Sequence, residues 1–386
     1  MQVFVIFLVV LPISGVVSIN ITEPEFFEIN IDRDHPEKLY KAFEDFKKKY
    51  NRKYKDESEN QQRFNNFVKS YNNVDKLNAK SKAAGYDTQF GINKFSDLST
   101  AEFHGRLSNV VPSNNTGLPM LNFDKKKPDF RAADMNKTRH KRRSTRYPDY
   151  FDLRNEKING RYIVGPIKDQ GQCACCWGFA VTALVETVYA AHSGKFKSLS
   201  DQEVCDCGTE GTPGCKGGSL TLGVQYVKKY GLSGDEDYPY DQNRANQGRR
   251  CRLRETDRIV PARAFNFAVI NPRRAEEQII QVLTEWKVPV AVYFKVGDQF
   301  KEYKEGVIIE DDCRRATQWH AGAIVGYDTV EDSRGRSHDY WIIKNSWGGD
   351  WAESGYVRVV RGRDWCSIED QPMTGDIKDH KDNYYY

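Results

Sequence analysis

All nine cysteines of this 386-residue chain lie between Cys173 and Cys366, and the first 172 residues contain none. Cysteines of a chain that enters an oxidising compartment usually pair, and each disulfide joins two distant positions of the fold. An odd number of cysteines leaves at least one thiol unpaired. The sequence therefore predicts a disulfide-linked domain in its C-terminal part, with one thiol that needs another explanation.

The N-terminus predicts entry into the secretory route. Residues Val3 to Val17 are almost all apolar, too few to cross a bilayer comfortably, and a small residue follows at Ser18. We expect a signal peptide over residues 1–18. No Lys or Arg precedes the apolar run, so a buried N-terminal segment is the alternative. No later run is apolar enough to span a membrane. Three Asn-x-Thr glycosylation acceptors fit a lysosomal or extracellular destination, namely Asn20, Asn114 and Asn136.

The charge distribution argues against a nucleic-acid partner. Residues 1–143 carry 25 Lys and Arg against 18 Asp and Glu, whereas residues 144–386 carry 33 against 36. The larger part is slightly acidic and has no basic stripe with interleaved aromatic residues. The opposite net charges would let the two parts attract each other, and acid would weaken this attraction as carboxylates take up protons.

Two amphipathic helices are predicted before the cysteine-rich part. The first begins at Pro36 after Asp34 as its N-cap, and the second runs from about Ser58 to Gly85. Their apolar faces consist of Leu39, Phe43, Phe46 and Tyr50 in the first helix, and of Phe64, Phe67, Tyr71, Val74 and Leu77 in the second. Such faces must pack against another surface.

The chain divides at a polar linker. Residues 107–146 lack periodicity and end in the basic cluster Arg139 to Arg143, which is either a cleavage site for a proprotein convertase or a solvated loop. From residue 147 to 386, glycine-rich turns and short apolar strands surround one well-marked helix, as expected of a single α+β domain. The predicted units are thus 1–18, a helical unit at 19–106, a linker at 107–146 and a large domain at 147–386.

Cys176 is the candidate nucleophile. The segment from Lys168 to Phe179 leads into a helix with apolar residues at helical spacing, so Cys176 lies at or near its N-terminus. Backbone N–H groups and the helix macrodipole favour the thiolate over the thiol at that position. On spacing alone, Cys176 could equally be half of a disulfide or a packed core residue.

His320 is the only good candidate for a base. His192 lies roughly 24 Å from Cys176 along the same helix, His338 follows a charged stretch that we interpret as a loop insertion, and His380 lies in a polar tail. His320 instead begins an apolar strand with small residues that allow close approach of another backbone.

Asn345, in the segment Asn345-Ser-Trp347-Gly, is suited to orient that base. An uncharged amide holds an imidazolium in place without neutralising it, which suits a thiolate–imidazolium pair. Alone, Asn345 would more simply be a cap of the turn before Gly348 and Gly349.

These segments resemble the active-site blocks of the papain and cathepsin family of cysteine proteases. Gln170 to Trp177, the strand that His320 begins, and Asn345 to Gly348 occur in the family's order and close to its spacing, and the resemblance covers nearly everything from residue 147 to about 371. The N-terminal part is similar to the inhibitory propeptide of cathepsin L- and F-like precursors, the I29 type. That similarity rests on Glu59, Arg63, Phe67, Val74 and Asn78, and on Gly91-x-Asn93-x-Phe95-x-Asp97.

The resemblance implies a two-lobed α+β fold, with a helical lobe and a β-barrel-like lobe, preceded by a helical inhibitory prodomain. It implies catalysis by Cys176, His320 and Asn345, with Gln170 and the Cys176 N–H as the oxyanion hole. The implied reaction is hydrolysis of proteins or peptides through a thioester, in a zymogen whose prodomain runs backwards through the cleft. No cofactor or metal is implied, and we expect a monomer.

The resemblance also implies the disulfides Cys173–Cys215, Cys207–Cys251 and Cys313–Cys366. Of the three remaining cysteines, we pair Cys175 with Cys205, which leaves the nucleophile as the free thiol. Three residues depart from the family pattern: Cys175 stands where Ser is usual, Ala174 where Gly is usual, and Trp319 where relatives often carry Asp or Asn.

Substrate-binding residues follow from alignment with the family and are Gly217, Gly218, Leu220, Tyr293, Gln318, Ala321, Trp347 and Gln371. The pocket for the second residue before the scissile bond would be lined by five of them: Leu220, Tyr293, Gln318, Ala321 and Gln371. The two glutamines would make this pocket more polar than in typical relatives. No His-His pair occurs between Gly218 and Cys251, where an occluding loop like that of cathepsin B would lie, which favours an endopeptidase.

Three other functions stay open at this point. Cys173-x-x-Cys176 resembles a thioredoxin-type redox pair, although Asn345-Ser-Trp-Gly would then be unexplained. A zinc site is a second alternative, and its ligands would be Cys173, Cys176, Cys205 and Cys207. An inactive relative that serves as a binding or inhibitory protein is the strongest alternative, because of the three departures from the family pattern.

Overall fold

The computed structural model describes residues 36–113, 116–121, 147–208, 214–241, 251 and 258–377. The predicted signal peptide, Asp34, the three glycosylation acceptors, the basic cluster at 139–143 and His380 lie outside these residues. Over the described ranges, none of the helices combines the length and the apolar character that crossing a bilayer requires.

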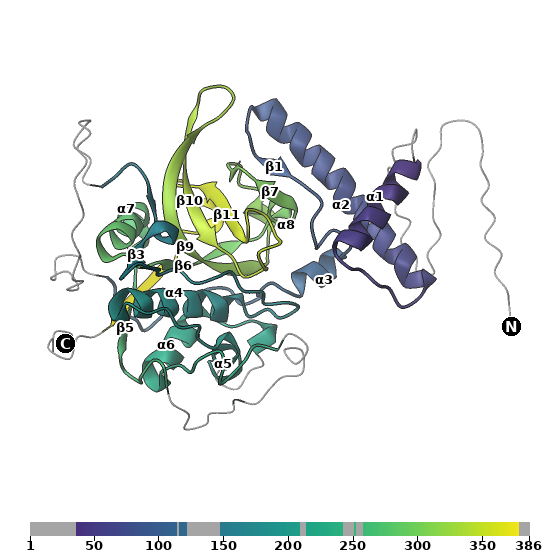
Figure 1. The fold of residues 1–386 in the computed structure, drawn as a ribbon. Coiled ribbons are helices and arrows are strands. Elements are labelled where there is room, and N and C mark those ends of the chain that lie inside the picture. Colours follow the sequence, from purple (N-terminus) through teal and green to yellow (C-terminus); the bar gives the residue numbers. More distant parts are fainter. Residues whose placement is uncertain are drawn as a thin grey trace, which may run out of the picture.

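The N-terminal unit consists of two crossing helices, as the periodicity predicts (Figure 1). Helix α1 spans Pro36–Lys49, and α2 spans Glu57–Ala84 and ends at Gly85, whose φ of 77° is left-handed. The aromatic residues of the two apolar faces pack against one another. Strand β1 (Gln89–Phe90) and helix α3 (Thr100–His104) follow, and Ser99 and Glu102 form a capping box at the start of α3.

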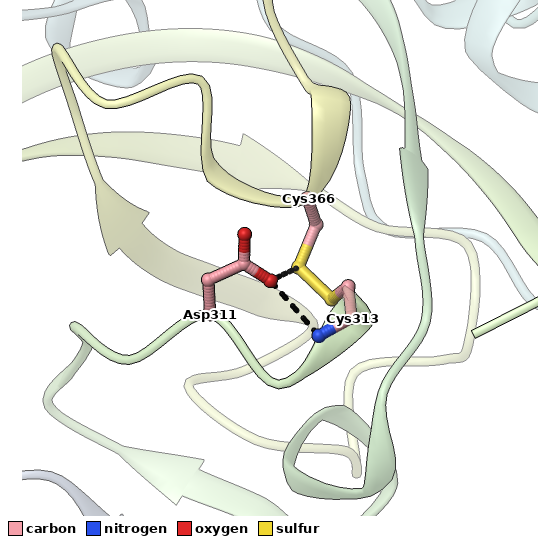
Figure 2. Close-up of side chains that lie close together, drawn as sticks. All are labelled: Asp311, Cys313 and Cys366. Atoms are coloured by element: carbon pink, nitrogen blue, oxygen red, sulfur yellow. Dashed lines mark hydrogen bonds between the residues drawn. A yellow bond between two sulfur atoms is a disulfide. The ribbon is translucent and has the colours of Figure 1, made fainter. Parts of the chain in front are cut away.

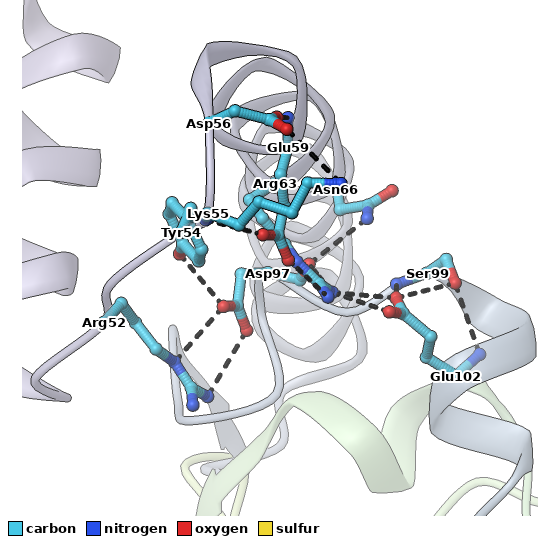
Figure 3. Close-up of polar contacts among 10 residues, drawn as sticks. All are labelled: Arg52, Tyr54, Lys55, Asp56, Glu59, Arg63, Asn66, Asp97, Ser99 and Glu102. Carbon is cyan, nitrogen blue, oxygen red and sulfur yellow. Dashed lines mark hydrogen bonds and ion pairs between the residues drawn. The ribbon is translucent and has the colours of Figure 1, made fainter.

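A buried carboxylate organises this unit (Figure 3). Asp97 accepts a hydrogen bond from the Tyr54 hydroxyl at 3.0 Å and pairs with the Arg52 guanidinium at 3.2 Å. Arg63 of α2 donates to the Asp97 carbonyl at 3.3 Å and pairs with Glu102 at 2.8 Å. These contacts tie the segment after β1 to the loop between α1 and α2 and to α2 itself.

The helical lobe of the large domain is built on α4 (Cys176–Ser193), with α5 (Asp201–Cys207) and α6 (Leu220–Tyr230) against it. Nearly every side chain of α4 is buried, because α5 and α6 cover one side and strands β9 and β12 cover the other. A helix that is apolar all round is expected in such a fully enclosed position. Gly194, with φ of 68°, ends it.

The second lobe is an eight-stranded sheet in the order β5-β12-β6-β9-β10-β11-β8, with β2 beside β9 (Figure 1). All its strand pairs are antiparallel except β11 with β8. In chain order the strands are β2 (Phe151–Asp152), β5 (Phe265–Val269), β6 (Val290–Lys295), β8 (Val307–Ile308), β9 (Trp319–Glu331), β10 (Ser337–Lys344), β11 (Tyr356–Val360) and β12 (Met373–Ile377). The two-lobed α+β fold with a helical prodomain is thereby confirmed.

Smaller elements complete the fold. Strand β7 (Tyr303–Glu305) pairs with β1 of the prodomain, and β3 (Lys157–Ile158) forms a hairpin with β4 (Arg161–Tyr162). Helix α7 spans Ala275–Gln281 and α8 spans Asp298–Glu302.

Four disulfides join the cysteines, as Cys173–Cys215, Cys175–Cys205, Cys207–Cys251 and Cys313–Cys366. Asp311 lies beside the last of these and accepts a hydrogen bond from the Cys313 N–H at 2.9 Å (Figure 2). This group has the spacing of a metal site. Its two sulfurs are bonded to each other, however, so they do not act as thiolate ligands.

Part of the predicted linker is bound to the large domain. Ser108 pairs with Trp319 at the start of β9, and the Leu121 N–H donates to the Val269 carbonyl at 2.8 Å. The polar, aperiodic sequence predicted a linker but not these contacts, because pairing through backbone groups depends little on side chains. The segment therefore begins as an extended strand-like stretch over both lobes.

We predict that replacing both Cys175 and Cys205 by Ser lowers the free energy of unfolding by about 2–4 kcal/mol. Both cysteines are buried, and a Cβ added at Gly178 would lie 2.7 Å from the Cys175 sulfur, so the bridge packs tightly against α4. Urea unfolding measures the loss. Thiol titration of the denatured, unreduced wild type should count one thiol, and a count of three would contradict the bridge.

Candidate active site

Cys176 is the first residue of α4 and, among the described residues, the one cysteine outside a disulfide. Its side chain is fully buried. Backbone N–H groups of Trp177 in its own lobe and of Ala321 on β9 in the other lobe lie near the sulfur and act to lower the pKa of the thiol. The helix N-terminus and strand β9 therefore meet at this sulfur.

His320 precedes Ala321 on β9 and is held by Asn345. Its Nε2 lies 2.7 Å from Asn345 Oδ1, and the same oxygen accepts the Ser346 N–H at 2.8 Å. Because Asn345 Oδ1 is the acceptor in both contacts, Nε2 of His320 carries the hydrogen. Nδ1 has no hydrogen-bond partner in the described part of the chain, so it is the nitrogen free to accept a proton.

Aromatic rings enclose the imidazole. Trp347 lies 4.6 Å from the His320 ring, centroid to centroid, and Phe294 and Phe300 lie at 5.4 and 6.1 Å. Burial lowers the pKa of His320 to about 4, although the hydrogen bond with Asn345 acts to raise it. Burial raises the pKa of the Cys176 thiol to about 12, although nearby backbone N–H groups act to lower it.

In this precursor, burial therefore disfavours the charged forms of both side chains, the thiolate of Cys176 and the imidazolium of His320. The thiolate–imidazolium pair that the sequence predicted stays a prediction.

Gln170 lies just before α4 and is fully buried. Its Nε2 donates to the carbonyl oxygens of Cys173 at 2.7 Å and of Arg106 at 2.8 Å, while its Oε1 accepts the Ser346 hydroxyl at 2.6 Å. The Ser346 contact orients the amide so that its NH₂ group faces the cleft side. The Arg106 carbonyl of the prodomain thus accepts a hydrogen bond from Gln170 Nε2, the donor that the resemblance assigns to the oxyanion hole.

The prodomain is anchored on both sides of that carbonyl. The Arg106 guanidinium donates to the Gly171 carbonyl at 2.6 Å and lies over the Phe95 ring at 4.8 Å. Two residues later, Ser108 and Trp319 exchange backbone hydrogen bonds of 2.7 and 2.9 Å. Extended backbone from the end of the prodomain and the start of the linker therefore lies along the start of β9, next to His320.

Opposite charges and aromatic rings add to this docking. Lys94 lies 2.7 Å from Asp169 and 2.7 Å from Asp350, which agrees with the opposite net charges of the two parts. Phe95 and Phe103 pack edge-on against Trp347. Trp347, which alignment assigned to substrate binding, is thus covered by the prodomain and shields His320.

The remaining aligned pocket residues gather at the boundary of the lobes. Leu220, Tyr293 and Ala321 are almost fully buried, and Gln371 is also buried. Tyr293 of β6 lies opposite Ala321 of β9, and its hydroxyl accepts the Leu220 N–H across the cleft.

Gly217 and Gly218 stand where side chains do not fit. A Cβ on Gly217 would lie 2.8 Å from the Ser108 hydroxyl, and one on Gly218 would lie 2.4 Å from the Trp177 ring. Gln318 is half-buried just before Trp319, and its Oε1 has no partner among the described residues.

Sequence reasoning missed Ser346 and Arg106. Ser346 orients Gln170, and its position beside Asn345 was the available signal. Arg106 acts through its backbone carbonyl, for which no side-chain pattern exists.

Two of the alternative functions conflict with the pairing of the cysteines. Cys173 is bonded to Cys215, so Cys173 and Cys176 do not form a redox pair. Cys205 and Cys207 are also in disulfides, which leaves Cys176 as the single thiolate available from the proposed zinc set.

Comparison with known proteins agrees with this geometry. Residues 147–375 match the papain family of cysteine proteases, and residues 43–103 match the cathepsin propeptide inhibitor domain. A cathepsin L-like proteinase of Phaedon cochleariae is 31% identical over 84% of this chain and 90% of its own length, and chymopapain of Carica papaya is 30% identical over 90% and 89%. The structure of digestive procathepsin L 3 of Tenebrio molitor superposes with a TM-score of 0.70 at 27% identity, covering 88% of this chain and 99% of that one.

The match to the peptidase family covers more than half of the chain, and the inhibitor domain precedes it in the same order as in procathepsins. The chain therefore belongs to the papain family of cysteine proteases, as a cathepsin L-like endopeptidase precursor with an intramolecular inhibitor.

Proposed function

We propose that this chain, once its prodomain has left, cleaves peptide bonds with Cys176 as nucleophile and His320 as base. The observation that carries the proposal is the meeting of the α4 N-terminus with β9. There the backbone N–H of Ala321, the residue next to His320, lies near the Cys176 sulfur, and Asn345 holds Nε2 so that Nδ1 can take the thiol proton.

In the proposed reaction, the thiol proton of Cys176 has passed to His320 Nδ1 before attack, and the thiolate of this thiolate–imidazolium pair attacks the substrate carbonyl carbon. The oxyanion is bound by Gln170 Nε2 and the Cys176 N–H, and one such donor contributes about 3 kcal/mol in comparable enzymes. The protonated His320 then gives its proton to the leaving amine. Water, deprotonated by the same imidazole, hydrolyses the thioester.

We further propose an endopeptidase that acts as a monomer without a cofactor, after passage through the secretory route to a lysosome or to the extracellular space. The four disulfides support an oxidising compartment. Glycosylation at the three Asn-x-Thr sites and cleavage in the basic cluster at 139–143 belong to the same proposal.

Replacing Cys176 by Ala should lower the hydrolysis of peptides by about 10⁴-fold or more. The measurement is turnover of a peptide library by acid-activated precursor, with and without an epoxide that alkylates cysteine proteases. The variant and the inhibitor should abolish the same activity. Correctly folded, processed wild type without activity would instead support the inactive, inhibitor-like relative.

Cys176 should react slowly with iodoacetamide in the precursor and rapidly in the mature enzyme. Only the thiolate reacts, and a pKa of about 12 leaves the sulfur protonated at neutral pH. The precursor's alkylation rate should therefore rise roughly tenfold per pH unit above pH 7. At pH 7 the mature form should react about 10³-fold faster or more, since water and the helix N-terminus then lower the pKa. Mass spectrometry of Cys176 measures both rates, and equal rates would contradict this account.

Tyr293 determines the size of the pocket for the second residue before the scissile bond in this proposal. Its side chain is 3% exposed and reaches from β6 to the N-terminus of α6, where the hydroxyl meets the Leu220 N–H. Val110 of the linker lies near Gly217, and this residue is still 37% exposed. No deep pocket therefore encloses its side chain. We infer that the mature enzyme prefers Gly, Ala or Ser at that substrate position.

Tyr293→Ala should open this pocket and raise kcat/KM for substrates with Leu or Phe there, relative to Ala, by about tenfold or more. Tyr293→Phe is the matched control, because it removes the hydroxyl and keeps the ring. The control should retain the preference for small residues. A wild type that already prefers Leu or Phe, or a preference unchanged in Tyr293→Ala, would refute the assignment.

A further inference from the structure

The hairpin between β9 and β10 contacts the C-terminal end of α2 through three successive carbonyl groups. Arg334 donates to the Ala83 carbonyl at 2.5 Å, Arg336 donates to the Ala84 carbonyl at 2.6 Å, and the Ser333 hydroxyl donates to the Gly85 carbonyl at 2.9 Å. The last carbonyls of a helix have no partner within it and form the negative end of its macrodipole. Two guanidinium groups from the large domain therefore cap a prodomain helix.

Asp332 holds this hairpin in shape without help from the prodomain. Its Oδ1 accepts the N–H groups of Arg334 and Arg336 at 2.9 and 3.0 Å, and its Oδ2 accepts Arg336 Nε and His338 Nε2, both at 2.7 Å. Burial opposes ionisation, but hydrogen bonds from His338 and from the backbone hold the pKa of Asp332 well below its usual range. His338, which follows the predicted loop, lies buried at the start of β10.

The contact between the hairpin and α2 restricts which residues can follow this helix. A Cβ at Gly85 would lie 2.4 Å from Arg334 Nε, so the guanidinium can approach as it does because this position has no side chain. Arg336 lies 5.0 Å over the Tyr86 ring, and His338 meets that ring edge-on at 5.7 Å. The hairpin thus fits a helix that ends in a left-handed Gly followed by an aromatic residue.

This contact is separate from the cleft. The prodomain reaches Gln170 and Trp319 through Arg106 and Ser108, which follow Gly85 by more than twenty residues. In Figure 1 the hairpin projects beyond the sheet toward the far end of α2, on the opposite side of the sheet from α4. Neither set of contacts shares a residue with the other.

We propose that residues 332–338 form a second docking site, specific for the C-terminal end of α2, that keeps the prodomain bound after the linker has been cut. Cutting the linker leaves these bonds intact, because both partners lie outside the residues between the two domains. The mature enzyme then carries a preformed site for this helix end, which adds to the contacts that the prodomain makes in the cleft, through Lys94 and through β1.

The test uses a full-length Cys176→Ala precursor in which residues 139–143 are replaced by a site for a sequence-specific protease. After cutting, the rate at which the prodomain dissociates is measured with the large domain immobilised. Arg334→Ala with Arg336→Ala should raise this rate about tenfold or more, because two charge-assisted hydrogen bonds are lost. Arg314→Ala with Arg315→Ala, which removes the same charge from exposed positions, should leave it unchanged.

A double-mutant cycle with Gly85→Ala separates this contact from general destabilisation. Gly85→Ala disturbs the helix end at the same place, so combining it with the hairpin variant should add little to either change alone. Strict additivity, or release at the wild-type rate in the hairpin variant, would overturn the proposal. Because Cys176→Ala performs no hydrolysis, the result is independent of the proposed catalytic mechanism.

Discussion

The proposed catalytic groups depend on the pairing of the segment before α4 with the segment after β10. The Gln170 N–H donates to the Ser346 carbonyl at 2.8 Å, the Ser346 hydroxyl donates to Gln170 Oε1 at 2.6 Å, and the Gly348 N–H donates to the Lys168 carbonyl at 3.0 Å. Because Asn345 directly precedes Ser346, the bonds that orient the Gln170 amide also fix the residue that holds His320. A shift between the lobes would therefore displace both at once, and small displacements of reacting groups are costly.

Latency in this precursor has an electrostatic component as well as a steric one. The prodomain places the Arg106 carbonyl on Gln170 and aromatic rings over Trp347, which keeps water from Cys176 and His320. Burial under the prodomain raises the pKa of the Cys176 thiol and lowers the pKa of His320, so the charged forms of both groups are disfavoured while the prodomain is bound. Suppressing the thiolate also lowers the susceptibility of the sulfur to oxidation, because that susceptibility follows thiolate character.

The sequence was sufficient for elements whose side chains carry a periodic or chemical pattern. The apolar spacing placed α1 and α2, Gly85 marked the end of α2, and the order of Cys176, His320 and Asn345 located the site. It was insufficient wherever backbone atoms make the contact. Tertiary arrangement alone determines three such contacts: the one made by the Arg106 carbonyl, the pairing of Ser108 with Trp319, and the hairpin bonds to α2. The residue types at these positions do not predict them. The charge states in the cleft likewise follow from burial, which the spacing of residues does not reveal.

Two separated contacts on one chain change how the prodomain is released. The hairpin contact lies at the C-terminal end of α2, and residues 86–105, which include β1 and α3, join it to Arg106 in the cleft. While one contact holds, the other re-forms as an intramolecular event at a high effective concentration. Opening of the cleft is then reversible until the hairpin also releases α2. The same argument explains why a short, solvent-exposed contact outside the cleft can govern latency: it contributes little free energy alone, but it sets the rate at which a transiently open cleft is covered again.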